Sequence, residues 1–255
     1  MTRRRGPSTR RGRSGSALLL IAILLLLWQA LFLWAGPDAL APPLVTLNYL
    51  AEQLWTGEMW PHIAATGAAF LIALAISIVL GLAVGLAVGL SRTATEVTEP
   101  LLLAANSVPK IALYPVVLLV FGIGMPAKIA FGALHGIVPV AIFTMTACRG
   151  IPAVLLKSAA VMRLESGDKI RSVLLPAALP DIVTGIRIGF SLTLIGTILG
   201  EMFGSQSGLG FLLMTAIGLQ NTRVIMAVTV LLIAFAATVS TLLLAFEKHL
   251  RHRTA

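Results

Sequence analysis

The feature that most constrains this chain is a series of long apolar blocks, separated by short segments that hold nearly all of its charges. Each block is roughly 16 to 28 residues long, and about 20 helical residues suffice to cross a hydrocarbon core about 30 Å thick. Only 11% of the residues are charged and 58% are hydrophobic, whereas about a quarter of a soluble domain is charged. The pattern therefore predicts a membrane protein and excludes an ordinary soluble fold.

The blocks predict an all-α, polytopic fold with about six membrane helices. The first block follows a basic stretch, as a secretory signal would. It has 18 uncharged residues before Gly36-Pro37-Asp38 and only a weak cleavage pattern, so we interpret it as a retained helix. The predicted helices are residues 17–35, 63–90, 101–123, 128–148, 182–203 and 224–246.

The distribution of Lys and Arg predicts the orientation of the chain. Six crossings place both termini on one side, and the positive-inside rule puts short basic loops in the cytoplasm. The two tails and the segments 91–100 and 149–181 together contain fifteen of the 19 Lys and Arg residues. The opposite side receives only Lys128 and Arg223. Parity and charge bias therefore agree that both termini are cytoplasmic.

The chain divides into three predicted parts. Residues 1–16 form a basic cytoplasmic tail, and residues 17–61 form the first membrane helix with an external, periplasmic loop that includes a short surface helix near residues 45–54. Residues 62–250 form the main transmembrane domain. Its loop at 149–181 is long enough to have structure or a function of its own.

Residues for enzyme chemistry are not found in this sequence. It has no G-x-x-x-x-G-K-[ST] motif to hold nucleotide phosphates, and its four histidines lack metal-ligand spacing. The lone Cys148 can form neither an internal disulfide nor a thiolate metal site. We therefore expect no catalytic residues, no metal and no bound cofactor. The basic residues orient the chain in the lipid membrane, so we expect no nucleic-acid partner.

Four polar residues in or near the spans are candidates for a translocation pathway: His135, Arg187, Ser191 and Glu201. Arg187 could extend to the interface, or it could face a cavity and attract anions. Glu201 is expected at the external interface, where it could also gate the external mouth. His135 is either a packed imidazole or a functional group.

Two backbone features leave alternatives open. Glycines recur every four residues in the second and fifth helices, a pattern that packs helices closely. They could serve packing within the bundle or the packing face of a dimer around a pore. Lys110 follows Pro109, where proline interrupts helical hydrogen bonding, so the third span could begin with a broken or re-entrant segment.

Several ordered motifs resemble the permeases of nitrate, sulfonate and taurine ABC importers. Together they extend over most of residues 62–246. The motifs are SVPKIALYP at 107–115, FGIG at 121–124, KI at 128–129, LLPAALP at 174–180, GIRIG at 185–189, GEM at 200–202 and SGLGF at 207–211.

The resemblance implies a type I importer permease of the bacterial cytoplasmic membrane, with a coupling helix within residues 155–173 that docks on a cytoplasmic ATPase. The family consensus in this loop begins Glu-Ala-Ala and has a glycine thirteen residues before the proline of the Leu-Pro motif. Lys157 stands at that glutamate, Ala159 at the second alanine and Arg163 at the glycine, so an alternative is that Gly167 supplies the bend instead. The expected coupling residues are Lys157, Ser158, Ala159, Ala160, Arg163, Leu164, Glu165, Ser166, Gly167 and Asp168.

The expected function is that of a permease subunit, working as a homodimer by alternating access. Its expected partners are ATPase subunits, which use ATP and Mg²⁺, and a periplasmic binding protein that delivers a small, anionic solute of the nitrate, sulfonate or taurine type. The alternative is an ATP-independent secondary transporter or channel. Such a protein needs acidic groups within the membrane, for which Asp181 and Glu201 are the candidates.

Overall fold

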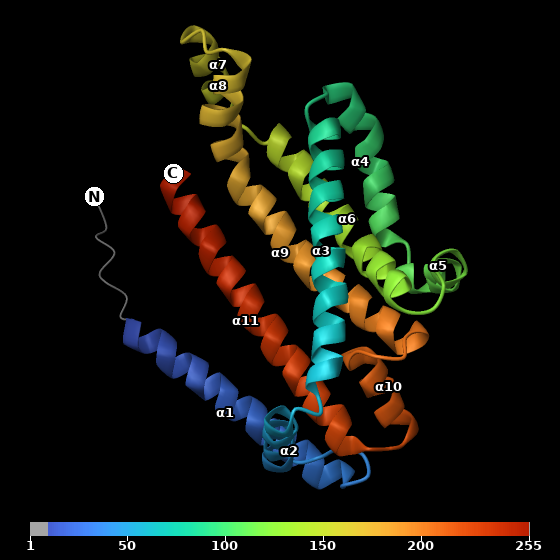
Figure 1. Cartoon of the computed structure of the whole chain (residues 1–255). Helices are drawn as coiled ribbons and strands as arrows, with labels where there is room; N and C mark the ends of the chain where they lie inside the picture. The colour runs from blue at the N-terminus through green and yellow to red at the C-terminus, as the bar shows by residue number, and fades with distance from the viewer. Residues whose placement is uncertain (1–9, 255) are drawn as a thin grey trace. The chain divides into compact units, whose positions relative to one another are not determined.

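The computed structural model describes residues 10–254 of the chain, and within this range every regular element is a helix (Figure 1). The prediction of an all-α, polytopic protein is therefore confirmed. The elements are α1 (Arg10–Ala35), α2 (Pro43–Thr56), α3 (Trp60–Gly89), α4 (Arg92–Ser107), a 3₁₀ turn (Lys110–Leu113), α5 (Tyr114–Phe121), α6 (Met125–Arg149), α7 (Ala153–Val161), α8 (Ser166–Lys169), a π-helical turn (Ile170–Leu174), α9 (Leu175–Gly204), α10 (Leu209–Gly218) and α11 (Thr222–Thr254).

The described residues fall into two compact units. One contains the chain up to Glu58 together with Thr215–Leu231, and the other contains Met59–Met214 together with the chain from Leu232. In the first unit, α2 is the short helix that the sequence predicted near residues 45–54. The indole Nε1 of Trp28 in α1 donates to the carbonyl of Ala41 at 3.0 Å, which fixes the turn before α2. Gly57 ends α2 in the left-handed conformation, with φ 86°.

The second unit is built around α6, which lies between α3 and α9 (Figure 1). Glycines make this close packing possible. A Cβ on Gly81 of α3 would come within 2.6 Å of Val140 Cβ on α6, and Gly185 and Gly189 of α9 face the same helix equally closely. The glycine pattern therefore serves packing inside one chain, which is the first of the two alternatives that the sequence left open.

An aromatic cluster closes the other side of α9. Phe70 of α3 meets Phe190 of α9 edge to face, with ring centroids 5.3 Å apart, and Phe235 of α11 lies 6.2 Å from Phe70. Such pairs add about 0.5–1.5 kcal/mol each beyond the area they bury. They attach α11 to the bundle through side-chain packing.

Four helices are long and apolar enough to cross a membrane by themselves: Trp60–Gly89, Met125–Arg149, Gly167–Gly204 and Thr222–Leu250. The first predicted span coincides with α1, whose apolar stretch Leu19–Ala35 is shorter than these. The remaining predicted span, residues 101–123, is a bent pair and is described next. The short helix α10 was not expected, because its 10 residues cannot cross a bilayer.

The span predicted at 101–123 is broken, which is the alternative that the sequence left open at Pro109. The chain there forms α4 and then the 3₁₀ turn with α5, and the two parts meet at 83°. Val108 has an extended backbone, with ψ 131°, because the ring of Pro109 disfavours a helical residue before it. The interruption expected at Pro109 is therefore present, and it divides the whole span.

The fifth predicted helix begins much earlier than residue 182. A continuous helical stretch runs from Gly167 to Gly204, so residues assigned to the loop up to 181 belong to α9. Pro176 stands in the first turn of α9, directly after the π-helical turn, and Pro180 lies inside α9. Prolines that we read as loop boundaries are thus compatible with a helix.

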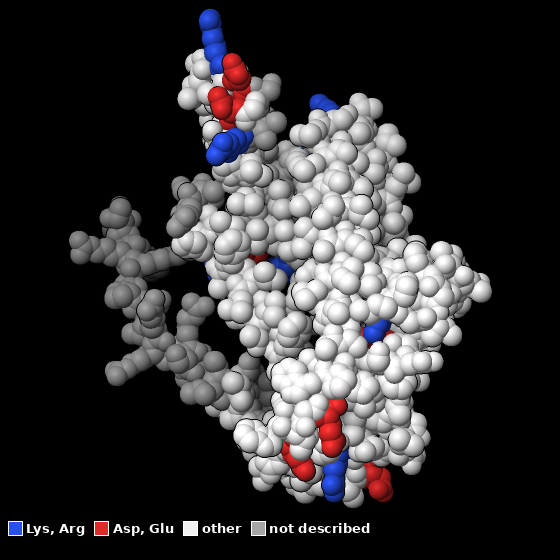
Figure 2. All heavy atoms as spheres, in the orientation of Figure 1, with Lys and Arg blue, Asp and Glu red and all other residues white. Residues whose placement is uncertain are grey.

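Between α6 and this long helix lies a compact helical hairpin, α7 and α8, at one tip of the unit (Figure 1). Its turn is at Arg163, which has a left-handed φ of 51°. The alternative that Gly167 supplies the bend is wrong, because Gly167 lies within α8. Figure 2 shows charged atoms gathered at the tip formed by α7 and α8, whereas the adjoining face is largely uncharged.

Candidate functional site

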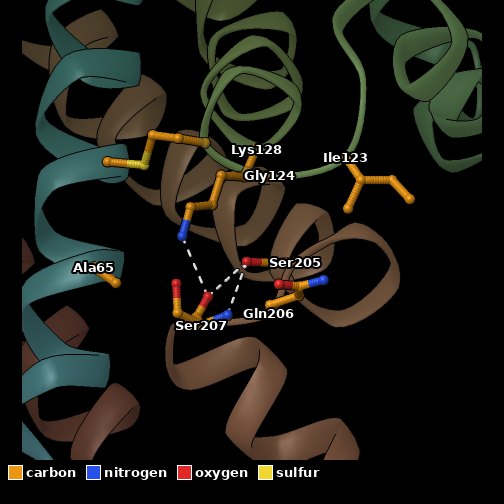
Figure 3. A pocket seen from close by; sticks show the side chains of 8 residues that line it. Ala65, Ile123, Gly124, Lys128, Ser205, Gln206 and Ser207 are labelled. Carbon is orange, nitrogen blue, oxygen red and sulfur yellow. Dashed lines mark hydrogen bonds between the residues drawn. The ribbon is translucent and has the colours of Figure 1, made fainter.

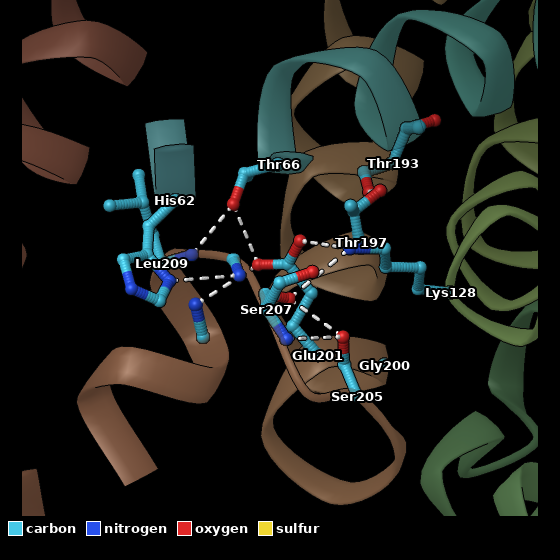
Figure 4. Close-up of polar contacts among 12 residues, drawn as sticks. His62, Thr66, Lys128, Thr193, Thr197, Gly200, Glu201, Ser205, Ser207 and Leu209 are labelled. Atoms are coloured by element: carbon cyan, nitrogen blue, oxygen red, sulfur yellow. Dashed lines mark hydrogen bonds and ion pairs between the residues drawn. The ribbon is translucent and has the colours of Figure 1, made fainter. Parts of the chain in front are cut away.

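The bundle buries a charged group, the carboxylate of Glu201, near the end of α9. Its side chain has no exposed surface. One oxygen accepts from Lys128 Nζ of α6 at 3.1 Å, and the other accepts from Thr66 Oγ1 of α3 at 2.7 Å and from the backbone N–H of Gly210 at 3.0 Å. Both oxygens of the carboxylate therefore accept hydrogen bonds from other helices, namely α3, α6 and α10 (Figure 4).

Lys128 completes this arrangement by reaching the loop between α9 and α10. Its ammonium group also donates to the carbonyl of Ser207 at 3.2 Å, and its side chain is 2% exposed. Ser205 Oγ donates to the same carbonyl at 2.6 Å, which tightens the loop. We call Thr66, Lys128, Glu201, the carbonyl of Ser207 and the N–H of Gly210 the Glu201 network.

Two residues of α3 hold the start of α10 against this network. The N–H of Leu209 donates to Thr66 Oγ1 at 2.7 Å, while the N–H of Gly208 donates to His62 Nδ1 at 3.2 Å. The His62 ring also stacks on Phe211, with centroids 6.1 Å apart. The first backbone N–H groups of α10, which no helical carbonyl can satisfy, thus find partners on α3.

Gly208 is required at its position for two reasons. Its φ of 118° is strained for any residue with a side chain, and a Cβ there would collide with the Glu201 carboxylate. The Ser-Gly-Leu-Gly sequence therefore lets the backbone pass directly over a buried charge.

A pocket of about 590 Å³ opens beside the network. It is lined by the N-terminal turn of α6, the 205–207 loop and Ala65 of α3, with Lys128 at one wall. Figure 3 shows the Lys128 side chain directed at Ser207, in the loop that also contains Gln206. Because Glu201 already neutralises Lys128, the wall formed by Lys128 holds no uncompensated charge.

The centre of the bundle contains hydroxyl groups and no charge at the α3, α6 and α9 junction. Ser77 Oγ lies 3.2 Å from Thr193 Oγ1 and donates to the carbonyl of Ala73 at 2.8 Å. Thr197 Oγ1 donates to the carbonyl of Thr193 at 2.9 Å. These hydroxyls are fully buried and do not line an open path. Ser77 connects α3 to α9, whereas the Thr197 bond lies within α9.

The structure places the predicted pathway residues in three different settings. Glu201 is fully buried, whereas the sequence analysis expected it at the external interface. Arg187 forms an ion pair with Glu247 of α11 at 3.1 Å, and Ser191 Oγ donates to the Arg187 carbonyl at 3.4 Å. His135 is half-buried on α6, and its Nδ1 donates to the carbonyl of Phe131 at 2.9 Å.

The predicted coupling residues all lie in the α7–α8 hairpin. Lys157, Ser158, Ala159 and Ala160 belong to α7. Arg163, Leu164 and Glu165 form the turn, and Ser166, Gly167 and Asp168 belong to α8. Ala159 is buried, whereas Val161 and Met162 are 84% and 67% exposed.

Sequence reasoning missed Lys128, Thr66 and His62 as members of a site. Lys128 was placed at the external end of the helix predicted at 128–148, and the structure buries it in the first turns of α6. The sequence did contain a signal for Lys128. Lys128 and Glu201 stand at the external ends of two predicted helices, so the two opposite charges are able to pair. Thr66 and His62 gave no signal, because their roles depend on how α3 packs against α10.

Comparisons with known proteins agree with this architecture. The profile of the family "Binding-protein-dependent transport system inner membrane component" matches residues 77–255. The riboflavin transport system permease RibX of Chloroflexus aurantiacus is 36% identical over 207 residues, 80% of this chain and 77% of that protein. The taurine transport system permease TauC of Escherichia coli is 28% identical over 214 residues, 81% of this chain and 78% of that protein.

Two further similarities support the same conclusion. The putative aliphatic sulfonates transport permease SsuC of Bacillus subtilis is 28% identical over 226 residues, 88% of this chain and 82% of that protein. A solved inward-facing structure of the MetNI methionine ABC transporter shares the fold, with TM-score 0.66 and 21% identity over 76% of this chain and 98% of that chain.

The family match includes α6, α9, the α7–α8 hairpin and, within the Glu201 network, Lys128 and Glu201. The comparisons confirm the resemblance seen in the motifs, the absence of an enzyme function for this subunit and its place as a multi-pass protein of the inner membrane. The chain therefore belongs to the family of binding-protein-dependent transport system inner membrane components, the permease subunits of ABC importers.

Proposed function

We propose that this chain forms the solute pathway of an ATP-driven importer and that a separate ATPase docks on the α7–α8 hairpin. The observation that supports the docking site is an uncovered apolar surface on α7. Val154 and Val161 are 71% and 84% exposed, and with Lys157, Ser158 and Met162 they line a groove of about 420 Å³. Exposed apolar side chains beside charged ones are typical of a protein interface.

The proposed mechanism is alternating access by two copies of the chain, with both termini in the cytoplasm. A periplasmic binding protein delivers the solute, and closure of two ATPase subunits, which use ATP and Mg²⁺, moves the hairpins and the helices attached to them. The continuous helical stretch from Gly167 to Gly204 supports this coupling, because it connects the hairpin to the Glu201 network. This chain itself binds no nucleotide or metal in the proposal.

The proposed solute is a small anion of the sulfonate, taurine or nitrate type. The names of relatives support this class, since they include a taurine permease and a nitrate import permease, NrtB of Leptolyngbya laminosa. A riboflavin permease and a formylaminopyrimidine permease are among the relatives too. The alternative of an ATP-independent transporter or channel has less support, because Glu201 is already neutralised by Lys128.

The test is affinity purification of the tagged chain from its native membrane, with the ATPase quantified by mass spectrometry. Val161→Asp places a charge in the proposed interface, and we expect it to lower recovery of the ATPase by about tenfold or more. The matched control is Leu44→Asp on α2, because Leu44 is 70% exposed and lies outside the hairpin.

Equal recovery of the ATPase with both variants would contradict docking on α7. A chain that purifies alone and transports solute in vesicles without ATP would favour the alternative function.

A further inference from the structure

All four tryptophans of the chain lie in one segment, between residues 28 and 60. Trp28 and Trp34 belong to the second half of α1, Trp55 to the last turn of α2, and Trp60 is the first residue of α3. In membrane proteins, tryptophan is enriched at the interface between lipid and water. The cluster therefore indicates that the segment containing α2 lies at one face of the bilayer.

A hydrogen bond sets the depth at which α2 begins. Trp28 lies seven residues before Ala35, the end of α1, which is about 10 Å along the helix axis. Its Nε1 donates to the carbonyl of Ala41 at 3.0 Å, so the chain turns back after α1 and brings the start of α2 beside Trp28. The apolar stretch of α1 continues to Ala35, and α2 therefore begins beside a part of α1 that is still apolar.

Two lines of exposed side chains run along α2, each with one residue per helical turn. They are an apolar line of Leu47, Ala51 and Trp55 and, directly beside it, a polar line of Asn48, Glu52 and Thr56. Trp55 is 93% exposed, whereas Thr46 on the other side of the helix is fully buried. An apolar face next to a polar one is typical of a helix that lies in the plane of a membrane interface.

The charges of this segment indicate which kind of lipid surface it fits. Residues 36–61 contain three acidic residues and no Lys or Arg. Anionic headgroups attract basic segments, so they offer no attraction to this one. Apolar burial is the interaction that remains, and the segment therefore fits acyl chains beneath zwitterionic headgroups.

We propose that α2 lies in the membrane interface beside the end of α1, with its apolar line among the lipid chains and its polar line in water. A helix in this position buries its apolar face about 5–10 Å into the boundary between headgroups and acyl chains. The sequence predicted only a short surface helix. The structure assigns to this helix a lipid-facing side and a depth, which the bond between Trp28 and Ala41 sets.

The test measures the surroundings of spin labels on single cysteines, in the complete chain reconstituted in phosphatidylcholine vesicles. Cys148→Ser removes the chain's one cysteine. Leu47→Cys and Ala51→Cys then label the apolar line, and their neighbours Asn48→Cys and Glu52→Cys label the polar line as matched controls. Oxygen concentrates in lipid and a nickel chelate in water, so the collision rates of each label with the two reagents distinguish lipid from water.

We expect collisions with oxygen to exceed collisions with nickel at Leu47→Cys and Ala51→Cys. The order should reverse at Asn48→Cys and Glu52→Cys, although each is the sequence neighbour of a lipid-facing position. Phosphatidylglycerol added to the vesicles should leave these ratios unchanged, because the segment has no Lys or Arg to bind it.

A further variant tests the depth. Trp28→Phe keeps an apolar ring but removes the Nε1–H donor to the Ala41 carbonyl. With this change, the oxygen-to-nickel ratio at Leu47→Cys should fall, because the start of α2 is no longer held beside Trp28. An unchanged ratio would refute the depth that the proposal assigns.

Two other results would overturn the lipid contact itself. Nickel collisions that dominate at all four positions would show that α2 lies in water. Low collision rates with both reagents at Leu47→Cys and Ala51→Cys would show that protein, such as a second copy of the chain, covers the apolar line. None of these measurements involves the ATPase or the solute, so the inference is tested separately from the proposed function.

Discussion

The ion pair between Lys128 and Glu201 places two opposite charges in a part of the bundle that water does not reach. Both side chains are almost completely buried, and the carboxylate accepts two further hydrogen bonds. Removing one member of such a pair leaves an isolated buried charge, which costs about 3–5 kcal/mol. The pair is therefore important to the fold even if the net stabilisation of the intact pair is small.

We predict that Lys128→Met lowers the free energy of unfolding by about 3–5 kcal/mol. The double variant Lys128→Met with Glu201→Gln should recover most of this loss, because no charge remains buried. The measurement is denaturant-induced unfolding of the purified chain in mild detergent. Arg92→Met is the control, since Arg92 and Glu96 form an exposed pair, and its effect should stay within about 1 kcal/mol.

A loss of stability in the double variant as large as in Lys128→Met would show that the charges themselves, and not their pairing, are needed.

Arg163 adopts a conformation that suits glycine better than arginine. A left-handed φ costs an ordinary residue about 1–2 kcal/mol, and the family resemblance places a glycine here. We predict that Arg163→Gly raises the free energy of unfolding of the hairpin by about 1 kcal/mol, measured as slower amide hydrogen exchange in α7 and α8. The comparison is Gly167→Ala, which lies within α8 with open space around it and should not loosen the turn.

Faster exchange in Arg163→Gly would mean that the arginine side chain holds the turn through a contact stronger than the backbone strain.

At the scale of the elements, α6 is the helix against which the others are fitted. Glycines of α3 and α9 meet its two sides, and Gly200 of α9 lies against the backbone of Lys128. Close backbone approach increases dispersion contacts between helices, which lipid cannot replace. The same packing brings Glu201 and Thr66 to Lys128.

We predict that Gly85→Ala destabilises the bundle by about 1–3 kcal/mol through overpacking. A Cβ at Gly85 would strike Thr144 and the carbonyl of Ala141 on α6, whereas a Cβ at Gly67 of the same helix meets nothing within 4 Å. Gly67→Ala is therefore the matched control and should stabilise α3 slightly. Apparent melting temperatures of the two variants in the same detergent are the measurement, and equal shifts would contradict close packing at Gly85.

At the scale of the whole molecule, the distribution of Lys and Arg predicts the orientation in the membrane. Both termini should lie in the cytoplasm, together with the α7–α8 hairpin. We predict that cysteines introduced at Ser8 and Thr254, in the Cys148→Ser background, react with an impermeant reagent only when it is added to inside-out vesicles. A cysteine at Asn48 of α2 should react only in intact cells with a permeable outer membrane, and a terminus labelled from the same side as Asn48 would refute the orientation.

The sequence by itself determined that this protein lies in a lipid bilayer and that its fold is all-α. Apolar blocks long enough to cross a bilayer require helices, because a backbone in lipid must satisfy its own hydrogen bonds. The order of local motifs was enough to identify the family, and Pro109 was enough to predict an interruption in the third span. All of these properties follow from residues that are neighbours in the chain.

Only the tertiary structure decided which polar groups meet. Lys128 and Glu201 are separated by 73 residues and Arg187 and Glu247 by 60, so their pairing depends on how α6, α9 and α11 pack. The same packing showed that the glycines serve the bundle and that the turn of the hairpin lies at Arg163. Contacts between distant segments depend on shape and burial together, and no local pattern in the sequence specifies them.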